Sequence, residues 1–246
     1  MEPNGDLIVA PLYNIYTMCR TGNHAIIFWM LFNLGGHTQN IDTYCFWNVE
    51  TGVYFYNDCN HAFYTYPNNI KHLIQSFEDT TPMRVTPTVN SKKVVILRDF
   101  LNMFASRIKK FGKKLSSNPS YIHTIQELIF VWKELAKKYH DPQYTFISYN
   151  QWVTSKQYRD MISQALGIAN EIDNTSYVSH IGDGSSFCGE KLESNIGDYM
   201  QRHTQLDIQE NKGMLQSVLD DHELVALNKE IFGVDIKNTI DQQILL

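Results

Sequence analysis

The chain has 246 residues, which is enough for one large α/β domain and short for two independent domains, so we expect a single domain over residues 1–246. Hydrophobic residues make up 43% of the chain and charged residues 19%, which excludes a disordered protein. The formal net charge of −5 argues against a nucleic-acid partner.

The chain carries no sequence feature that would direct it to a membrane or a secretory compartment. Its first residues, MEPNGDLIVAPLYN, lack the basic region and long apolar core of a secretory signal. The longest apolar run, Ala25 to Phe32, is far too short to cross a bilayer. The cysteines form no CxxC pair and no zinc-like spacing with histidines; they are Cys19, Cys45, Cys59 and Cys188. We therefore expect a cytoplasmic protein, of the source cell or of a host cell, with free thiols and no membrane anchor.

The first predicted unit is a strand, a loop and a helix. A short apolar strand near Ile15 to Met18 leads into a polar loop and then into an apolar helix over about residues 24–34. The loop brings together a cation, a hydroxyl, a flexible glycine and a helix-capping side chain, which are Arg20, Thr21, Gly22 and Asn23. Because the unpaired N–H groups and the positive dipole end of the helix point at this loop, we expect it to hold an anion.

Two further strands are predicted in the middle of the chain. The segment 44–66 is rich in aromatic residues and reads as irregular structure with short strands, whose rings either line an acceptor pocket or belong to the core. Residues 72–77 form a short strand that ends at Glu78 and Asp79. Residues 93–97 form a β-branched apolar run typical of a buried central parallel strand. An amphipathic helix follows this run, with Asp99 as its cap.

The remaining elements continue the alternation of strands and helices. We predict an amphipathic helix over 122–139, a strand over 144–149 and a helix over 157–166 that Gly167 ends. Residues 181–190 read as a glycine- and serine-rich loop, and two or three helices close the chain. The alternation predicts an α/β fold with a central, mainly parallel sheet flanked by helices on both faces. Its ligand crevice lies beyond the carboxyl ends of the strands.

The loop CRTGNHAI resembles the 5′-phosphosulfate loop of sulfotransferases. It is not the loop of nucleoside triphosphatases, because GxxxxGK[ST] is absent and the basic residue precedes the glycine. On this resemblance Arg20 takes the basic position, Thr21 the hydroxyl position and Gly22 the glycine position. Asn23 and His24 replace the usual pair of threonines, and Ala25 follows. The resemblance implies a P-loop-like three-layer sandwich that binds 3′-phosphoadenosine-5′-phosphosulfate (PAPS).

A second segment, ILRDFLNMFASR, is similar to the site that holds the 3′-phosphate of this donor. Arg98 stands at the predicted strand end and Ser106 follows eight residues later, as in sulfotransferases. Two helical turns bring Ser106 onto the face that points back toward the end of the strand. The two segments together suggest a nucleotide with phosphate groups at two ends.

Two weaker matches to the same family lie further along the chain. Tyr149 stands at a strand end where sulfotransferases often have a tyrosine near the adenine, although Asn150 replaces the acidic residue that usually follows. The loop GDGSSFCGEK resembles the late loop that closes over the nucleotide, but it lacks the common Arg-Lys-Gly signature. Its candidate donor-binding residues are Ser185, Ser186 and Phe187.

The resemblance also implies a general base at a strand end, about twenty residues before Arg98. Glu78 fits this position best. Asp79 is adjacent to it, and His24 and His72 are rivals for the same role.

The predicted function is transfer of a sulfuryl group from PAPS to a hydroxyl or amine of a small-molecule, lipid or saccharide acceptor, with adenosine 3′,5′-bisphosphate (PAP) as product. Arg20 and the helix N-terminus would neutralise charge on the transferred group. No metal is expected, because the donor carries its own leaving group.

A P-loop nucleotide kinase or other phosphotransferase is one alternative, weakened by the missing Walker lysine. The other alternative is a non-catalytic relative that binds a nucleotide without turnover. It is supported by the replacement of the usual threonine pair by Asn23 and His24. The acceptor and the oligomeric state stay open.

Overall fold

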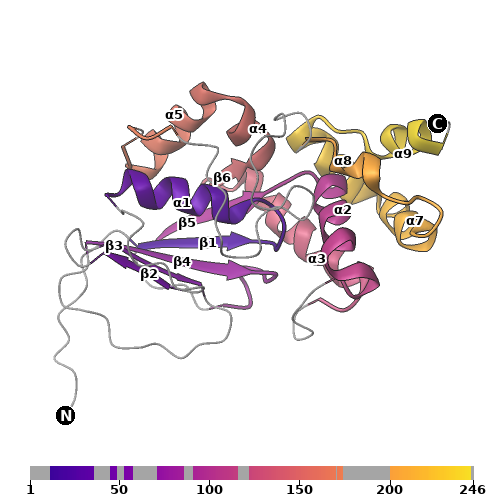
Figure 1. Cartoon of the computed structure of the whole chain (residues 1–246), viewed down its shortest axis with the longest axis horizontal. Helices are drawn as coiled ribbons and strands as arrows, with labels where there is room; N and C mark the ends of the chain where they lie inside the picture. The colour runs from indigo at the N-terminus through magenta and orange to yellow at the C-terminus, as the bar shows by residue number, and fades with distance from the viewer. Residues whose placement is uncertain are drawn as a thin grey trace, which may run out of the picture.

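The computed structural model describes residues 12–35, 71–85, 91–115, 122–169, 171–173 and 200–244, and the backbone of two short strands at 45–48 and 53–57. The strands of these ranges form one sheet in the order β2-β3-β4-β1-β5-β6 (Figure 1). Their bounds are β1 Leu12–Thr17, β2 Cys45–Asn48, β3 Val53–Asn57, β4 His72–Glu78, β5 Lys92–Leu97 and β6 Tyr144–Ser148.

The sheet is mainly parallel, as the alternation of strands and helices predicted. All neighbours from β3 to β6 pair in parallel, and β2 pairs antiparallel with β3 at one edge. β1 lies between β4 and β5, and Thr17 at its end pairs with Glu78 on one side and Ile96 on the other. The carboxyl ends of the three central strands therefore meet at one edge of the sheet, where the crevice of such a fold lies.

Helices cover both faces of this sheet, which confirms the three-layer, P-loop-like α/β sandwich. Alternate residues of the central strands face opposite sides: Ile15 and Val94 pack in one apolar cluster, and Tyr16 and Val95 in another. The first cluster includes α1 Asn23–Asn33, α4 Tyr149–Thr154 and α5 Lys156–Leu166. The second includes α2 Phe100–Phe111, α3 Ile125–Ala136, α7 Lys212–Asp220, α8 His222–Phe232 and α9 Ile236–Ile244.

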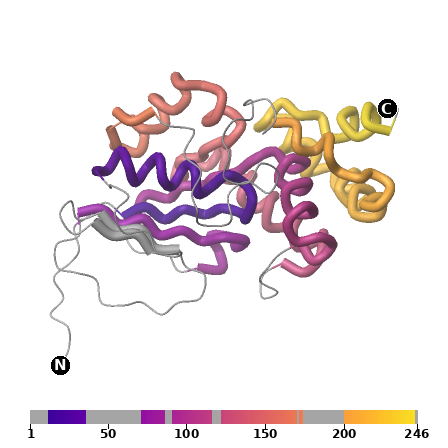
Figure 2. Tube along the Cα trace, viewed as in Figure 1, coloured from indigo at the N-terminus to yellow at the C-terminus, as the bar shows by residue number. Residues whose placement is uncertain are grey.

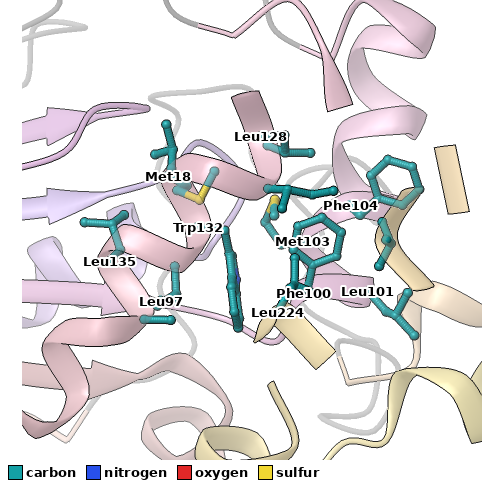
Figure 3. Packing of buried hydrophobic residues seen from close by; sticks show 14 of the residues in the cluster. Met18, Leu97, Phe100, Leu101, Met103, Phe104, Leu128, Trp132, Leu135 and Leu224 are labelled. Carbon is teal, nitrogen blue, oxygen red and sulfur yellow. The ribbon is translucent and has the colours of Figure 1, made fainter. Parts of the chain in front are cut away.

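The C-terminal helices extend the second layer away from the sheet. Figure 2 shows the orange and yellow part of the tube beside α2 and α3, far from it in sequence. Trp132 of α3 is buried there against Phe100, at a ring-centroid distance of 5.8 Å, and Leu224 of α8 belongs to the same cluster (Figure 3). The Trp132 indole N–H donates to the carbonyl of Arg98 over 3.0 Å, which ties this core to the end of β5.

Several helix ends follow the capping chemistry expected from the sequence. Asp99 accepts a hydrogen bond from the Asn102 amide over 3.0 Å and so begins α2, as predicted. Thr124 and Glu127 form a capping box at the start of α3. Gly167 ends α5 in a left-handed conformation, also as predicted.

Several predicted boundaries and one predicted cap are wrong. The helix expected over 122–139, for example, is α3 Ile125–Ala136. The strand expected over 144–149 ends at Ser148, because the Ser148 side chain caps α4 and Tyr149 is already helical. Asn23 does not cap α1; Gly22 holds the cap position, and no side chain bonds the cap there. Among the described helices, none has both the length and the apolar character needed to cross a membrane.

Candidate anion-binding site

The loop between β1 and α1 is closed by its own hydroxyl groups. The Thr21 hydroxyl donates to the Met18 carbonyl over 2.7 Å and lies 2.8 Å from the Thr17 hydroxyl, while the Thr21 amide donates to the same carbonyl over 3.3 Å. Two loop residues, Arg20 and Gly22, have left-handed backbones with φ of 72° and 83°. A non-glycine residue in this region is uncommon, so the surrounding bonds must hold Arg20 in place. Thr21 thus stabilises the loop through a buried hydroxyl.

The N-terminus of α1 faces this loop without a side-chain cap. Asn23 is the first helical residue, and its side-chain amide donates to Oε1 of Glu78 at the end of β4 instead of to the helix. The amides of the first turn, including those of His24 and Ala25, belong to the group that an α-helix leaves without intrahelical partners. An anion is a fitting partner for such groups.

Gly22 is required because the ring of Tyr149 lies directly against it. A Cβ atom at Gly22 would come within 2.1 Å of Cε2 of Tyr149. The same ring lies 5.1 Å from the guanidinium carbon of Arg98, at the end of β5. The structure therefore brings together three residues that the sequence singled out in separate segments.

Ser106 on α2 is the meeting point of two arginines. Its buried hydroxyl accepts a hydrogen bond from Nε of Arg20 over 3.3 Å and another from Nη1 of Arg202 over 3.2 Å. Hydrogen bonds from guanidinium groups are the type that anionic oxygens accept most strongly. Positive charge from two distant parts of the chain is thus concentrated beside the anion loop.

Arg98 is the most deeply buried of the site's arginines, with 1% of its surface exposed. Burial lowers the pKa of its guanidinium, and the neighbouring Tyr149 and Asp99 act in the opposite direction. Nε of Arg98 lies 4.0 Å from Oδ2 of Asp99, which is a long distance for an ion pair. The Arg98 guanidinium thus lies buried at the end of β5, against the Tyr149 ring.

Arg202 is a site residue that the sequence analysis missed. It begins the short helix η3 Arg202–Gln205, which docks on α2: the amide of His203 donates to the side-chain oxygen of Asn102 over 3.1 Å. The side-chain amide of Asn102 in turn donates to Asp99 and to the carbonyl of Met200. Arg202 stands in the polar stretch YMQRHTQ, which carries no motif, so only the folded chain reveals its place.

The base candidates Glu78 and His24 lie beside the loop. Oε1 of Glu78 is 3.5 Å from Nε2 of His24, and both side chains are partly exposed, at 17% and 23%. A carboxylate this close to an imidazole can help to orient it. They are the described base candidates with access to solvent at the carboxyl edge of the sheet.

The other two base candidates are placed differently. Asp79 is buried and forms an ion pair with Arg107 of α2, so its carboxylate is already engaged. His72 is the first residue of β4, at the end of the strand opposite to Glu78. Six residue steps along the strand separate them by about 20 Å, which places His72 away from the loop.

Some predicted residues lie outside the described part of the chain. These are Ser185, Ser186 and Phe187, and most of the aromatic segment 44–66 apart from the backbone of β2 and β3. Within the ranges that the structure does describe, no three His, Cys, Asp or Glu side chains gather in a group that could hold a metal ion. Cys19 carries a free thiol, whose pKa is raised chiefly by burial.

Comparison with solved structures shows distant similarity to a known protein. No protein-family model matches the chain, and no curated protein matches it. Among solved structures, the chain is similar to the mouse sulfotransferase SULT7A1 crystallised with PAP, with 11% sequence identity and a TM-score of 0.47. The alignment covers 95% of this chain and 88% of the mouse chain. Similarity at this level does not assign a family.

Proposed function

We propose that this protein is a sulfotransferase that moves a sulfuryl group from PAPS to a hydroxyl or amine of a small-molecule, lipid or saccharide acceptor. The observation that carries the proposal is the meeting of Arg20 and Arg202 on Ser106, beside a helix N-terminus that no side chain caps. Guanidinium groups and helix N-termini both recognise phosphate and sulfate oxygens. Their arrangement suits a nucleotide that carries anionic groups at two ends.

We assign the 5′-phosphosulfate to Arg20 and to the backbone amides of Gly22, Asn23, His24 and Ala25. Thr21 stabilises this loop through its contact with the Thr17 hydroxyl of β1 and its hydrogen bond to the Met18 carbonyl. This half of the site lacks the lysine with which triphosphatase loops hold terminal phosphates, which disfavours the kinase alternative.

We assign the 3′-phosphate to Ser106, Arg98 and Arg202, and the adenine to the neighbourhood of Tyr149. Arg98 and Tyr149 are stacked at the end of β5, and Ser106 lies on the helix that follows. Contact between Arg20 and Ser106 joins the two halves of the site. Ser185, Ser186 and Phe187 stay predictions for the closing loop.

Bound PAPS supplies an activated sulfuryl group together with its own leaving group. The chain has to hold the acceptor in line, neutralise charge and remove the acceptor proton. We propose that Glu78 and His24 act as a pair in the last step. Either Glu78 takes the proton directly, or His24 takes it while the carboxylate stabilises the imidazolium. Glu78 at the end of β4 and His24 in the first turn of α1 both lie next to the loop, which supports both versions.

The direct test is transfer of radiolabelled sulfuryl groups from PAPS to a panel of hydroxyl and amine acceptors, without added metal. We expect transfer by the wild type and a fall of about a hundredfold or more in the variant that lacks the base, Glu78→Gln or His24→Gln. His140→Gln is the matched control, because His140 pairs with Glu230 over 2.6 Å on the exposed surface.

Three outcomes would contradict this proposal. Phosphoryl transfer from Mg-ATP would establish the kinase alternative. Tight PAP binding without transfer to any acceptor would favour the non-catalytic relative. Full activity in both variants would show that the base lies elsewhere. The single domain and the cytoplasmic location expected from the sequence stay predictions.

A further inference from the structure

A buried ion pair lies directly behind the anion loop. Arg107 of α2 has no exposed surface, and its Nη2 atom donates to Oδ1 of Asp79, the residue that follows β4. Nη1 of Arg107 donates to the carbonyl of Leu115 over 2.9 Å. The pair therefore joins the helix on one face of the sheet to the carboxyl edge of the sheet itself.

Both members of the pair also bond the backbone of the loop at Cys19. Oδ1 of Asp79 accepts a hydrogen bond from the Cys19 amide over 2.9 Å, and Nε of Arg107 donates to the Cys19 carbonyl over 3.1 Å. The amide of Asp79 donates to the carbonyl of Thr17 over 3.0 Å. The Cys19 amide is thus bonded to Asp79 and the Cys19 carbonyl to Arg107, and a third hydrogen bond fixes the end of β1 at Thr17.

The Cys19 carbonyl belongs to the peptide group that begins Arg20. Arg20 is the non-glycine residue with φ of 72°, a conformation that L-residues avoid. Fixing the plane of this peptide fixes the direction in which the Arg20 side chain leaves the loop. That side chain reaches Ser106, the residue directly before Arg107 on α2. Two adjacent residues of one helix therefore hold the side chain of Arg20 and the backbone before it.

We propose that Asp79 and Arg107 are positioning residues that hold the Cys19–Arg20 peptide and thereby aim the Arg20 guanidinium at the anionic groups of the donor. The inference rests on the proposed function for the identity of that anion. It gives Asp79 a role different from the general base for which the sequence made it a candidate.

The competing explanation is an ion pair that only stabilises the fold. The chain offers a control in Arg159, a second buried arginine, which forms an ion pair with the exposed Asp173. Arg159 donates to both carboxylate oxygens of Asp173 and to the carbonyl of Trp152. None of these bonds is made to the loop. If Arg107 only stabilises the fold, substitutions in the two pairs that lower the melting temperature equally should have equal effects on anion binding and on the loop.

The test compares Arg107→Met, Asp79→Asn and the double variant with Arg159→Met. Each protein is assayed for melting temperature, for PAP affinity by calorimetry and for the rate at which iodoacetamide alkylates Cys19, followed by peptide mass spectrometry. Cys19 is the reporter because it stands inside the held segment, and burial raises the pKa of its thiol. Wild-type Cys19 should therefore react slowly.

We expect both single variants to bind PAP about tenfold or more weakly and to alkylate Cys19 about tenfold or more faster, a typical size for the loss of an orienting partner. The double variant should be little worse than either single variant, because the two residues act as a unit. Arg159→Met should leave both readouts close to wild type at a comparable melting temperature.

The inference is overturned if Asp79→Asn or Arg107→Met matches Arg159→Met in PAP affinity or in Cys19 alkylation. Asp79→Asn is isosteric, so it decides the matter if Arg107→Met does not fold. If wild type fails to bind PAP, the proposed function is lost. The alkylation comparison then decides by itself whether the pair holds the loop.

Discussion

Ser106 is the residue in which the two halves of the candidate site meet. Its hydroxyl can accept two hydrogen bonds, and guanidinium groups from Arg20 and Arg202 make both. The first arginine precedes Ser106 by 86 residues and the second follows it by 96. A single small side chain therefore fixes the distance between the loop after β1 and the C-terminal part of the chain.

Removing this hydroxyl should weaken anion binding. Ser106→Ala leaves both guanidinium groups without a shared acceptor, so we expect a loss of about tenfold in PAP affinity, which corresponds to about 1.4 kcal/mol. Calorimetry on Ser163→Ala provides the control, since the Ser163 hydroxyl is also buried but donates to the Asp160 carbonyl on α5. An equal loss in both variants would contradict a role of Ser106 in the site.

Gly22 allows a second prediction at the same scale. Gly22→Ala combines a left-handed backbone with a Cβ atom 2.1 Å from the Tyr149 ring, so we expect a loss of about 3 kcal/mol or more in the free energy of unfolding. Gly233→Ala shares the left-handed backbone, with φ of 69°, but its Cβ would meet no atom within 4 Å, so it should cost only about 1 kcal/mol. Urea denaturation of both variants measures the difference. Equal losses would mean that Tyr149 does not pack on the loop in solution.

The sequence carried enough information to predict Arg20 and Ser106, because each stands at a fixed distance from a recognisable strand end. Arg202 could not be found in this way, since it lies in a short helix without a motif, and its place depends on how η3 docks. The role of Asn23 was also mistaken. A residue of this type before an apolar helix usually caps it, but here Glu78 from β4 attracts its side-chain amide.

At the scale of elements, η3 and α2 form the joint that brings Arg202 to the site. His203 is bonded through its amide to Asn102, and its Nδ1 atom lies 3.3 Å from the same side-chain oxygen. The pKa of His203 is lowered, chiefly by burial. The nearby Asp99 carboxylate raises this pKa, and the Arg98 guanidinium lowers it further. The joint is therefore expected to keep this histidine neutral.

This lowered pKa makes the joint sensitive to acid. The unfolded chain binds a proton to this histidine near its ordinary pKa of about 6.5, whereas the folded chain resists it until a lower pH. The stabilising contribution is present above about pH 6.5 and is lost as the pH falls through the folded pKa.

We expect urea denaturation between pH 7.5 and pH 5.5 to show a smaller loss of stability for His203→Gln than for wild type. His72, whose pKa is lowered first by burial, leaves part of the pH dependence in place. His123→Gln, at an exposed position, should follow the wild-type curve. An unchanged slope in His203→Gln would contradict the assignment.

The elements themselves were largely predictable. β5 has a β-branched run because a central strand is buried on both faces of the sheet. α2 and α3 have an apolar periodicity because each helix buries one of its faces. The short helix α4 was missed, because six residues are too few to show a period and its start depends on the Ser148 cap. The strand order could not be read from the sequence, since it depends on which strands pair over long distances.

At the scale of the whole molecule, the candidate site draws on both ends of the described chain. The loop after β1 supplies Arg20, the middle supplies Arg98 and Ser106, and η3 supplies Arg202. Because the C-terminal helices share one apolar core with α2 and α3, the position of Arg202 is coupled to the packing of this layer. We therefore expect anion binding at the candidate site to depend on the complete fold and not on the loop alone.

The measurement that tests this account most directly is calorimetry, without added metal, of PAP, adenosine 5′-monophosphate and ATP. It uses wild type, Arg98→Ala and Arg202→Ala, with Arg84→Ala as an exposed control beside Phe130. The account predicts that wild type and the control bind PAP much more tightly than the other two nucleotides, and that Arg98→Ala and Arg202→Ala lose this preference. Equal binding of PAP and the monophosphate, or a preference for Mg-ATP in a parallel titration, would contradict it.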